Sequence, residues 1–423
     1  MPKIDVMPSK RIYDALIQDI SGDQAICDLI DNSIDNWKIL KKTELLEVNI
    51  SISESKIEIK DNAGGIDLET LPLLLMPGGT NRGGGEGIKG IWGVGAKRSL
   101  FFLGEKITIL TRKKNEDGLK LKVDEDWFTK DEGRDKWKIE YSIDNSMPEE
   151  VTKIIIENLK VILNPFSIRE IRKSITRTYR DEIKEGTLRI IFNDDIIKII
   201  LKIPWSKSDY APPSRYITDI PVPRSDRKAH VEITLGVMTQ PGEEYSYGID
   251  FIGNGRIILQ NNLDWRMGFK KERLGLSHPT INRFKAVVRV SGDSQDIPWN
   301  SAKSDINPNH PTYVNIADLV FQVSRQYVSF LRKNYDVTSK LFRVRADETD
   351  IKDIIFDYGR EFRKVVKEYR EPKKEVTITS FKVPEEDYNE LVEYFGLQGK
   401  PKKAVGLFVF NRALKEVRGI DED

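Results

Sequence analysis

The nine residues DLIDNSIDN, at positions 28–36, constrain this chain more than any other stretch. Apolar residues recur through it at helical spacing, which predicts a helix. Asn32 follows Asp28 by four residues, so both side chains project from one face of that helix. A carboxylate there can orient water, and the neighbouring amide oxygen can ligate a hard cation. Without further motifs, Asp28, Asp31 and Asp35 would more simply be a solvated helix face.

Two glycine-rich segments follow this helix. Residues 57–67, IEIKDNAGGID, read as an apolar strand that ends in Asp61 and a turn. Residues 87–99, GIKGIWGVGAKRS, read as a glycine-rich turn that opens a helix. The N–H groups of such a turn, together with the helix dipole, favour phosphate. Residues 76–90, which lead into and overlap the second segment, contain seven glycines, which predicts a flexible loop.

In this order and spacing the three segments resemble the GHKL ATPase superfamily, which includes gyrase, MutL, the large heat-shock chaperones, histidine kinases and MORC proteins. The resemblance implies a Bergerat-type α/β sandwich that binds ATP and Mg²⁺ and hydrolyses ATP. Residues 76–90 then correspond to the ATP lid. A Rossmann-type reading of the glycines is not supported, because no βαβ unit or downstream ribose-binding acid accompanies them.

The resemblance also implies roles for individual residues. Asp28 stands where the family has the Glu that polarises the attacking water, and Asn32 matches the magnesium-binding Asn. Asp is shorter than Glu by about 1.5 Å, and a displacement of this size can cost on the order of 100-fold in rate, so slow hydrolysis is predicted. Asp61 would accept a hydrogen bond from the adenine amino group. The nucleotide-binding residues implied are Asn32, Asp61, Gly65, Gly90, Gly93, Val94, Gly95, Ala96, Lys97 and Thr152.

At two positions the match to the family's motifs is incomplete or ambiguous. The family's DxGxG pattern has Ala63 in place of its first glycine, a mild change if φ is negative and a costly one if φ is positive. The family's adenine-side Thr has two candidates. Gly186-Thr187 is the literal match, but it follows a long predicted helix at 166–184. Thr152 opens an apolar strand before that helix, as in MORC-like members, and is preferred.

The rest of residues 1–200 is predicted to complete the ATP-binding domain. Segments 107–114, 119–128 and 136–144 read as three antiparallel strands, and 187–199 reads as the strand that leaves the domain.

Residues 201–340 resemble the transducer (S5-like) domain of gyrase, MutL and MORC proteins. The proline-rich segment 204–226 is predicted as a boundary loop, Asn254-Gly255 as a tight hairpin turn and 313–334 as a helix. In the transducer domains of these proteins a loop lysine reaches the γ-phosphate. Lys303 stands at the corresponding place in this sequence and is the second catalytic candidate, after Asp28. The plain alternative is a surface lysine.

The C-terminal part is predicted as a helical connector, residues 341–372, and a small domain, residues 373–423, that resembles ribbon-helix-helix (Arc/MetJ) proteins. Phe381 and Val383 would face a dimer core. The candidate DNA-binding residues are Ser380, Lys382, Lys402 and Lys403. Because acids slightly outnumber Lys and Arg in this segment, dimerisation without DNA binding is an equal alternative.

The composition of the chain excludes several classes of protein and of metal site. Charged residues make up 32% of the chain but leave a net charge of +1, so bulk charge predicts no partner. A single cysteine, Cys27, excludes a disulfide framework, and three histidines exclude familiar zinc clusters. No apolar run approaches the ~20 residues of a membrane helix, so a soluble cytoplasmic protein is expected.

Together these features predict an α+β protein that is an ATP-gated dimeric clamp or switch, with DNA or another protein as candidate partners. The alternative is a nucleotide-gated binding module with little hydrolysis. A histidine kinase is disfavoured, because no phosphoacceptor helix precedes the ATP motifs.

Overall fold

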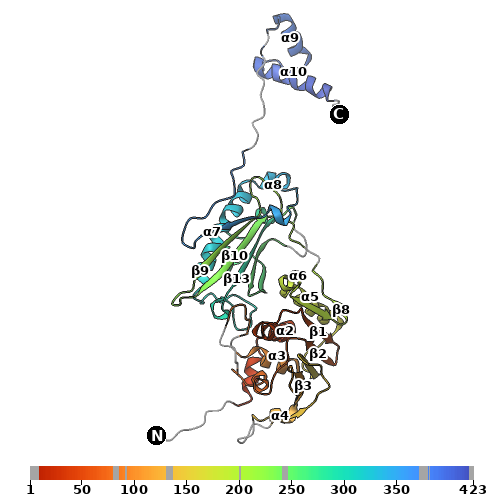
Figure 1. The fold of residues 1–423 in the computed structure, drawn as a ribbon. Helices are drawn as coiled ribbons and strands as arrows, with labels where there is room; N and C mark the ends of the chain where they lie inside the picture. The colour runs from red at the N-terminus through yellow and green to blue at the C-terminus, as the bar shows by residue number, and fades with distance from the viewer. Residues whose placement is uncertain are drawn as a thin grey trace. The chain divides into compact units, whose positions relative to one another are not determined.

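The computed structural model describes residues 9–79, 85–90, 93–129, 137–199, 202–240, 246–370, 380 and 382–418. The chain divides into two compact units, Met1–Tyr369 and Arg370–Asp423. The first unit contains two β-sheets with helices packed against them (Figure 1), which agrees with the predicted α+β class. Among the helices described, none is both long and apolar enough to cross a membrane.

The first sheet has eight strands in the order β5-β4-β3-β6-β2-β1-β7-β8. β1 and β7 are parallel, and the other neighbours are antiparallel. Its strands are β1 (Leu46–Ile52), β2 (Lys56–Asp61), β3 (Gly104–Arg112), β4 (Leu119–Val123), β5 (Tyr141–Ile143), β6 (Val151–Leu159), β7 (Leu188–Phe192) and β8 (Asp195–Ile196). The three strands predicted after residue 106 are present and antiparallel. The second of them stops at Val123, because the next residues form a short helix.

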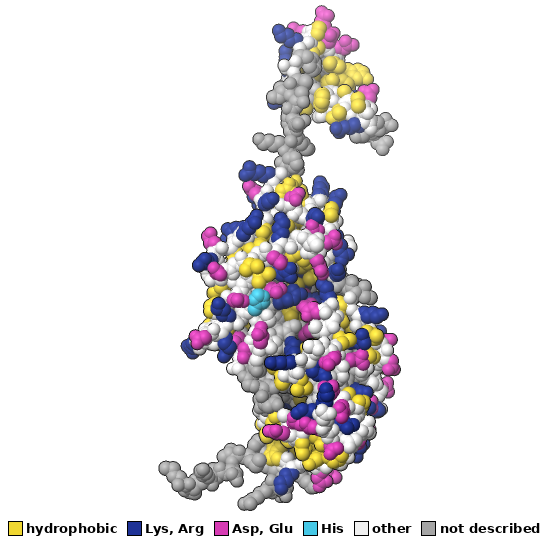
Figure 2. All heavy atoms as spheres, viewed as in Figure 1, with side chains coloured by type: hydrophobic (Ala, Val, Ile, Leu, Met, Phe, Trp, Pro, Cys, Tyr) yellow, Lys and Arg dark blue, Asp and Glu magenta, His cyan; other side chains and the backbone are white. Residues whose placement is uncertain are grey.

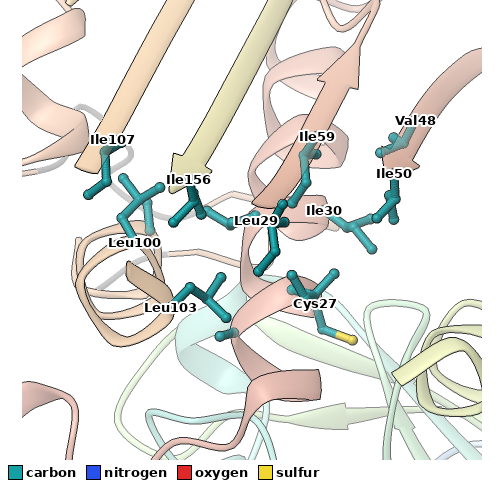
Figure 3. Packing of buried hydrophobic residues seen from close by; sticks show 14 of the residues in the cluster. Cys27, Leu29, Ile30, Val48, Ile50, Ile59, Leu100, Leu103, Ile107 and Ile156 are labelled. Carbon is teal, nitrogen blue, oxygen red and sulfur yellow. The ribbon is translucent and has the colours of Figure 1, made fainter. Parts of the chain in front are cut away.

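Helices cover this sheet and close its core. α2 begins with a capping box, in which Ser21 and Gln24 each bond the other's backbone. Figure 3 shows apolar side chains of α2 and α3 gathered against strands β1, β2, β3 and β6. The helices are α1 (Ile12–Leu16), α2 (Gly22–Ile39), α3 (Gly95–Leu103), α4 (Glu125–Thr129), α5 (Pro165–Thr178) and α6 (Arg180–Glu185), with a 3₁₀ turn η1 (Leu71–Leu74).

The second sheet has six strands in the order β12-β11-β13-β10-β9-β14. The predicted turn at Asn254-Gly255 joins β11 and β12, which are antiparallel. The long helix α7 buries an apolar stripe against the sheet, as its periodicity predicted. The strands are β9 (Ser214–Pro221), β10 (Lys228–Val237), β11 (Gly248–Gly253), β12 (Arg256–Asn262), β13 (Phe284–Ser291) and β14 (Lys352–Ile355). The helices are α7 (Tyr313–Lys333), α8 (Tyr335–Leu341) and the 3₁₀ turns η2 (Trp265–Met267), η3 (Pro279–Ile281), η4 (Ser294–Asp296) and η5 (Glu348–Asp350).

Two predictions about this part of the chain are wrong. The proline-rich segment is not all loop, because strand β9 runs through it with Tyr216, Thr218 and Ile220 buried on alternate positions. Its prolines stand at or outside the ends of that strand.

The connector is not helical in its described part, residues 341–370. After α8 ends at Leu341, the only regular elements are the turn η5 and strand β14, which pairs in parallel with β9. An extended segment then packs Phe362, Val365 and Val366 against the second core, with Gln326 accepting hydrogen bonds from the backbone of both valines. Tertiary burial of these apolar residues outweighs their helical spacing.

The second unit contains two helices, α9 (Glu385–Tyr394) and α10 (Lys402–Val417). Three acids occupy the first turn of α9, after Pro384. Phe395 and Phe408 stack edge to face between the helices, yet Val405 is the one residue of α10 that is buried. Most of the strand predicted before α9, within residues 375–383, lies outside the described residues. Its described residues, Ser380, Lys382 and Val383, have no regular secondary structure.

Candidate functional site

A cavity in the first unit brings together every residue that the sequence assigned to ATP. It is lined by elements of the first sheet's domain and by the loop between β13 and α7. The predicted residues in its lining are Asp28, Asn32, Asp61, Gly65, Gly90, Gly93, Val94, Gly95, Ala96, Lys97, Thr152 and Lys303. Residues 80–84 of the predicted lid and 91–92 of the phosphate turn lie outside the described residues.

Asp61 lies at one end of the cavity, where β2 ends. Its Oδ2 accepts a hydrogen bond from Ser33 Oγ at 2.6 Å, and its Oδ1 accepts one from the backbone N–H of Ala63 at 2.9 Å. Burial raises the pKa of Asp61 to about 6, although both hydrogen bonds oppose the shift. When ionised, Asp61 is therefore a stronger hydrogen-bond acceptor than an ordinary aspartate, and it lines the cavity.

Thr152 stands directly beside Asp61, since the two are paired in register between β6 and β2. Its hydroxyl lies 3.0 Å from that of Thr111 on β3. The competing residue, Thr187, donates its hydroxyl to the backbone oxygen of Glu182 and does not line the cavity. The geometry thus favours Thr152 as the threonine beside the acid.

The turn after Asp61 accommodates its unusual alanine. Ala63 is buried and is not among the described residues with positive φ, so alanine is unstrained there. Gly65 has φ 71°, and a Cβ atom on it would lie 2.2 Å from the backbone oxygen of Arg112. Gly65, the glycine of the family's pattern that this chain retains, is therefore required by close packing.

The second glycine segment leads into α3 and faces the cavity with its N-terminal turn. Gly93 has φ 60°, and a Cβ atom there would lie 2.6 Å from the backbone oxygen of Gly79. Lys97 also reaches this oxygen, with its Nζ at 2.6 Å. Backbone N–H groups at a helix start, with a cation beside them, provide a site for phosphate.

Asp28, Asp31 and Asp35 of α2 are buried, so the reading of a solvated helix face is wrong. Asp35 accepts hydrogen bonds from the backbone N–H groups of Lys89 at 2.8 Å and Gly90 at 2.7 Å. Its carboxylate therefore fixes the start of the phosphate turn against α2.

Asp28 is held by two arginines that the sequence reasoning missed. Arg98 on α3 donates to its Oδ2 from Nε at 2.9 Å and from Nη2 at 2.6 Å. Arg256 on β12 donates to its Oδ1 from Nη1 at 3.1 Å. Arg98 follows Lys97 in the motif and could have been suspected, whereas no local signal pointed to Arg256.

Asp31 contacts basic side chains from both domains of the first unit. These are the domain built on the first sheet, here called the first domain, and the domain built on the second sheet, the second domain. Lys303 donates to its Oδ2 at 2.8 Å, and Arg256 contacts the same oxygen. Tyr179 donates to its Oδ1 at 2.9 Å, and Lys89 lies 3.8 Å away. Burial alone would raise the pKa of Asp31, but Arg256, Lys303 and Lys89 hold it well below its usual range.

Asn32 lines the cavity one helical turn after Asp28. Its Nδ2 donates to the backbone oxygen of Asp28 at 2.8 Å, which identifies the other end of the side chain as the amide oxygen. No cluster of three or more His, Cys, Asp or Glu side chains suited to a metal occurs among the described residues.

The candidate DNA-binding residues belong to the second unit. Ser380, Lys382, Lys402 and Lys403 are exposed, and Lys402 and Lys403 begin α10. The Nζ of Lys402 lies 5.5 Å from the centre of the Tyr388 ring.

Residues 20–155 match the family model described as histidine kinase-, DNA gyrase B- and HSP90-like ATPase. No curated protein matches the chain. The matched segment covers less than half of the chain and contains Asp28, Asn32, Asp61, Lys97 and Thr152, but neither Thr187 nor Lys303. The match supports placing this segment of the chain in the GHKL superfamily of ATPases.

Proposed function

We propose that this protein is a Mg²⁺-dependent ATP hydrolase of GHKL type that acts as an ATP-gated dimeric clamp or switch. The observation that carries the proposal is the shared cavity, because it joins the motifs of the matched segment to Lys303 from the other domain. The order of the domains resembles that of MORC and MutL proteins, in which a transducer follows the ATPase domain, and this resemblance is the basis for proposing a role in DNA-related processing or defence.

In the proposed mechanism Asp61 and Thr152 bind the adenine end of ATP. The N–H groups around Gly93 and Gly95 and the charge of Lys97 hold the phosphates. Mg²⁺ would neutralise phosphate charge, and Asn32 would provide its protein ligand. Asp28 orients the attacking water, and Lys303 adds positive charge near the γ-phosphate.

Two measurements on the full chain test this function. ATP with Mg²⁺ is expected to raise the melting temperature, because a ligand that binds the folded state stabilises it by about 2.7 kcal/mol at 100 times its Kd. GTP should give no comparable shift. Steady-state phosphate release, measured with and without DNA, should be slow but above the buffer blank. Absence of an ATP-dependent shift would contradict the proposal.

The second candidate is a nucleotide-gated binding module that scarcely hydrolyses ATP. The contacts of Asp28 favour it, since Arg98 and Arg256 already occupy most of the acceptor positions of this carboxylate. An ATP-induced thermal shift without phosphate release would identify this function.

Lys303→Ala is expected to weaken the binding of ATP more than that of ADP. In the structure Lys303 pairs with Asp31, 2.8 Å away, and lines the cavity from the second domain's side. Only the triphosphate presents the charge for which Lys303 would leave this pair. Titration calorimetry with both nucleotides checks the effect, and Lys271→Ala, an exposed lysine of the same domain, serves as the control. Equal weakening of both nucleotides would mean that Lys303 does not sense the γ-phosphate.

The second unit is proposed to pair two copies of the chain without nucleotide. Figure 2 shows hydrophobic side chains gathered on the surface of its two helices. Tyr394, Leu407, Phe410 and Val417 are each at least 60% exposed, more apolar surface than so small a unit tolerates in water. Pairing through this surface would raise the effective concentration of the ATPase domains to roughly millimolar.

Removing residues 372–423 should therefore give a nucleotide-free monomer by light scattering. Dimerisation of the truncated chain with ATP, if it persists, should depend strongly on protein concentration, since the tether is lost. Lys382→Ala in the full chain is the matched control and should remain a dimer. If this variant loses DNA binding while it remains a dimer, the second unit contacts DNA through Lys382. A truncated chain that is a stable dimer without ATP would contradict this assignment.

A further inference from the structure

The hairpin between β11 and β12 carries its tip into the first domain. The tip consists of Asn254, Gly255 and Arg256, and the turn has φ 45° at Asn254 and 83° at Gly255. Asn and Gly are the residues that adopt such a left-handed turn most readily. This turn therefore places Arg256 at the very start of β12, where its long side chain projects beyond the second sheet.

Each residue of the tip touches the first domain. Asn254 Nδ2 donates to the backbone oxygen of Ile88, just before the phosphate turn, at 3.0 Å. A Cβ atom on Gly255 would lie 2.4 Å from Glu182 Oε1, so the backbone packs closely against α6. Arg256 is 3% exposed and ends on Asp28 and Asp31. The tip thus contacts both the glycine-rich segment that leads into α3 and the aspartates of α2.

The hydrogen bonds of Asp28 limit where a water molecule can bind to it. Each carboxylate oxygen accepts about two hydrogen bonds. Arg98 fills both positions on Oδ2, and Arg256 fills one of the two on Oδ1. Among the contacts of the described residues, one acceptor position of Asp28 is left, on Oδ1 next to the guanidinium of Arg256.

Packing alone does not explain an arginine at this position. Its Nε is buried without a hydrogen-bond partner in the part of the chain that the structure describes, a cost that an apolar side chain would avoid. Buried ion pairs are also seldom more stable than apolar residues of similar volume. Another of the ion pairs between the two domains, Arg289 with Asp181, does not involve the aspartates of α2.

We propose that Arg256 is a positioning residue for Asp28. From the tip of the hairpin it orients the carboxylate so that one acceptor position on Oδ1 faces the cavity. Hydrolysis then requires the second sheet to be docked on the first domain, and a shift of the hairpin alters the geometry of Asp28 directly. This inference rests on the proposed ATPase function.

A double-mutant cycle on nucleotide-free protein tests the contact itself. Arg256→Gln should lower the melting temperature of the wild type, and should lower that of Asp28→Asn by a clearly smaller amount, because the partner charge has already gone. Equal shifts in both backgrounds would overturn the proposal. Since this readout needs no ATP turnover, it tests the contact between Arg256 and Asp28 even if the wild type proves to be inactive and the proposed function fails.

Kinetics separate positioning from simple docking. Arg256→Gln is expected to lower kcat about 10- to 100-fold, while the Kd for ATP changes less than about threefold, because Arg256 does not line the cavity. Arg289→Gln, the matched interdomain control, should leave kcat within about twofold. An equal loss in both variants, or a loss of affinity instead of kcat, would overturn the proposal. If Arg256→Gln does not fold, Arg256→Lys keeps the charge and should show the same split with a smaller loss.

Discussion

Asp61→Asn is expected to abolish stabilisation by ATP and, in the absence of nucleotide, to make the protein more stable. The amide cannot replace a carboxylate that accepts the adenine amino group, so ATP loses its selective contact. The gain without nucleotide follows from burial, which raises the pKa of Asp61 from 3.8 to about 6. Removing a charge with this shift is worth up to about 3 kcal/mol.

The same shift predicts two opposite pH dependences. A carboxyl group whose pKa is raised on folding binds more protons in the native state, so this group's contribution to the stability of nucleotide-free protein falls as pH rises from about 4 to about 6. ATP binding should change the other way, and weaken as pH falls through about 6, because protonated Asp61 has lost its charge. Asp61→Asn should lack both components of the pH dependence.

Thermal unfolding with and without ATP, between pH 4 and 8, measures both effects. Glu58→Gln is a suitable control, since Glu58 lies on the same strand and outside the cavity. It should keep the ATP-induced shift. Stabilisation of Asp61→Asn by ATP to the wild-type extent would remove Asp61 from the adenine site.

Asp28→Asn is expected to stop phosphate release while ATP still binds. The amide replaces one acceptor oxygen with a donor and so loses the orientation of the water. It also faces Arg98, which loses its charged partner, and Arg256, which keeps only Asp31, so the nucleotide-free protein should melt at a lower temperature. Phosphate release, together with ATP titration of the same sample, checks both expectations.

Asp28→Glu is the more informative variant. From the sequence alone, a longer acid would be expected to maintain or raise turnover, because Glu is usual in the family. The contacts lead to the opposite expectation. The Asp28 side chain is 1% exposed and a Cβ atom on Gly95 would be 3.5 Å from its Oδ2, so another methylene has little room. We expect turnover to fall on the order of 100-fold. Turnover equal to or above wild type would show that Asp is a compromise.

Local sequence determined much of this protein. Helical spacing located α2 and α7, alternation located β1 and β2, and the Asn254-Gly255 turn was identifiable because few residue pairs adopt its backbone angles. The ATP motifs were also readable, since each consists of residues close in the chain whose spacing puts them on one turn or helix face. Every residue named from them lines the cavity.

Tertiary structure decided whatever depends on distant partners. Strand β14 and the extended segment after it contradict their helical pattern, because their apolar residues are buried against a sheet formed far away in the sequence. The burial of Asp28, Asp31 and Asp35 was equally unreadable, since charges enter a core only when partners meet them there. Those partners include Arg256 and Lys303, more than 200 residues away, and only the docking of the second sheet brings them to α2.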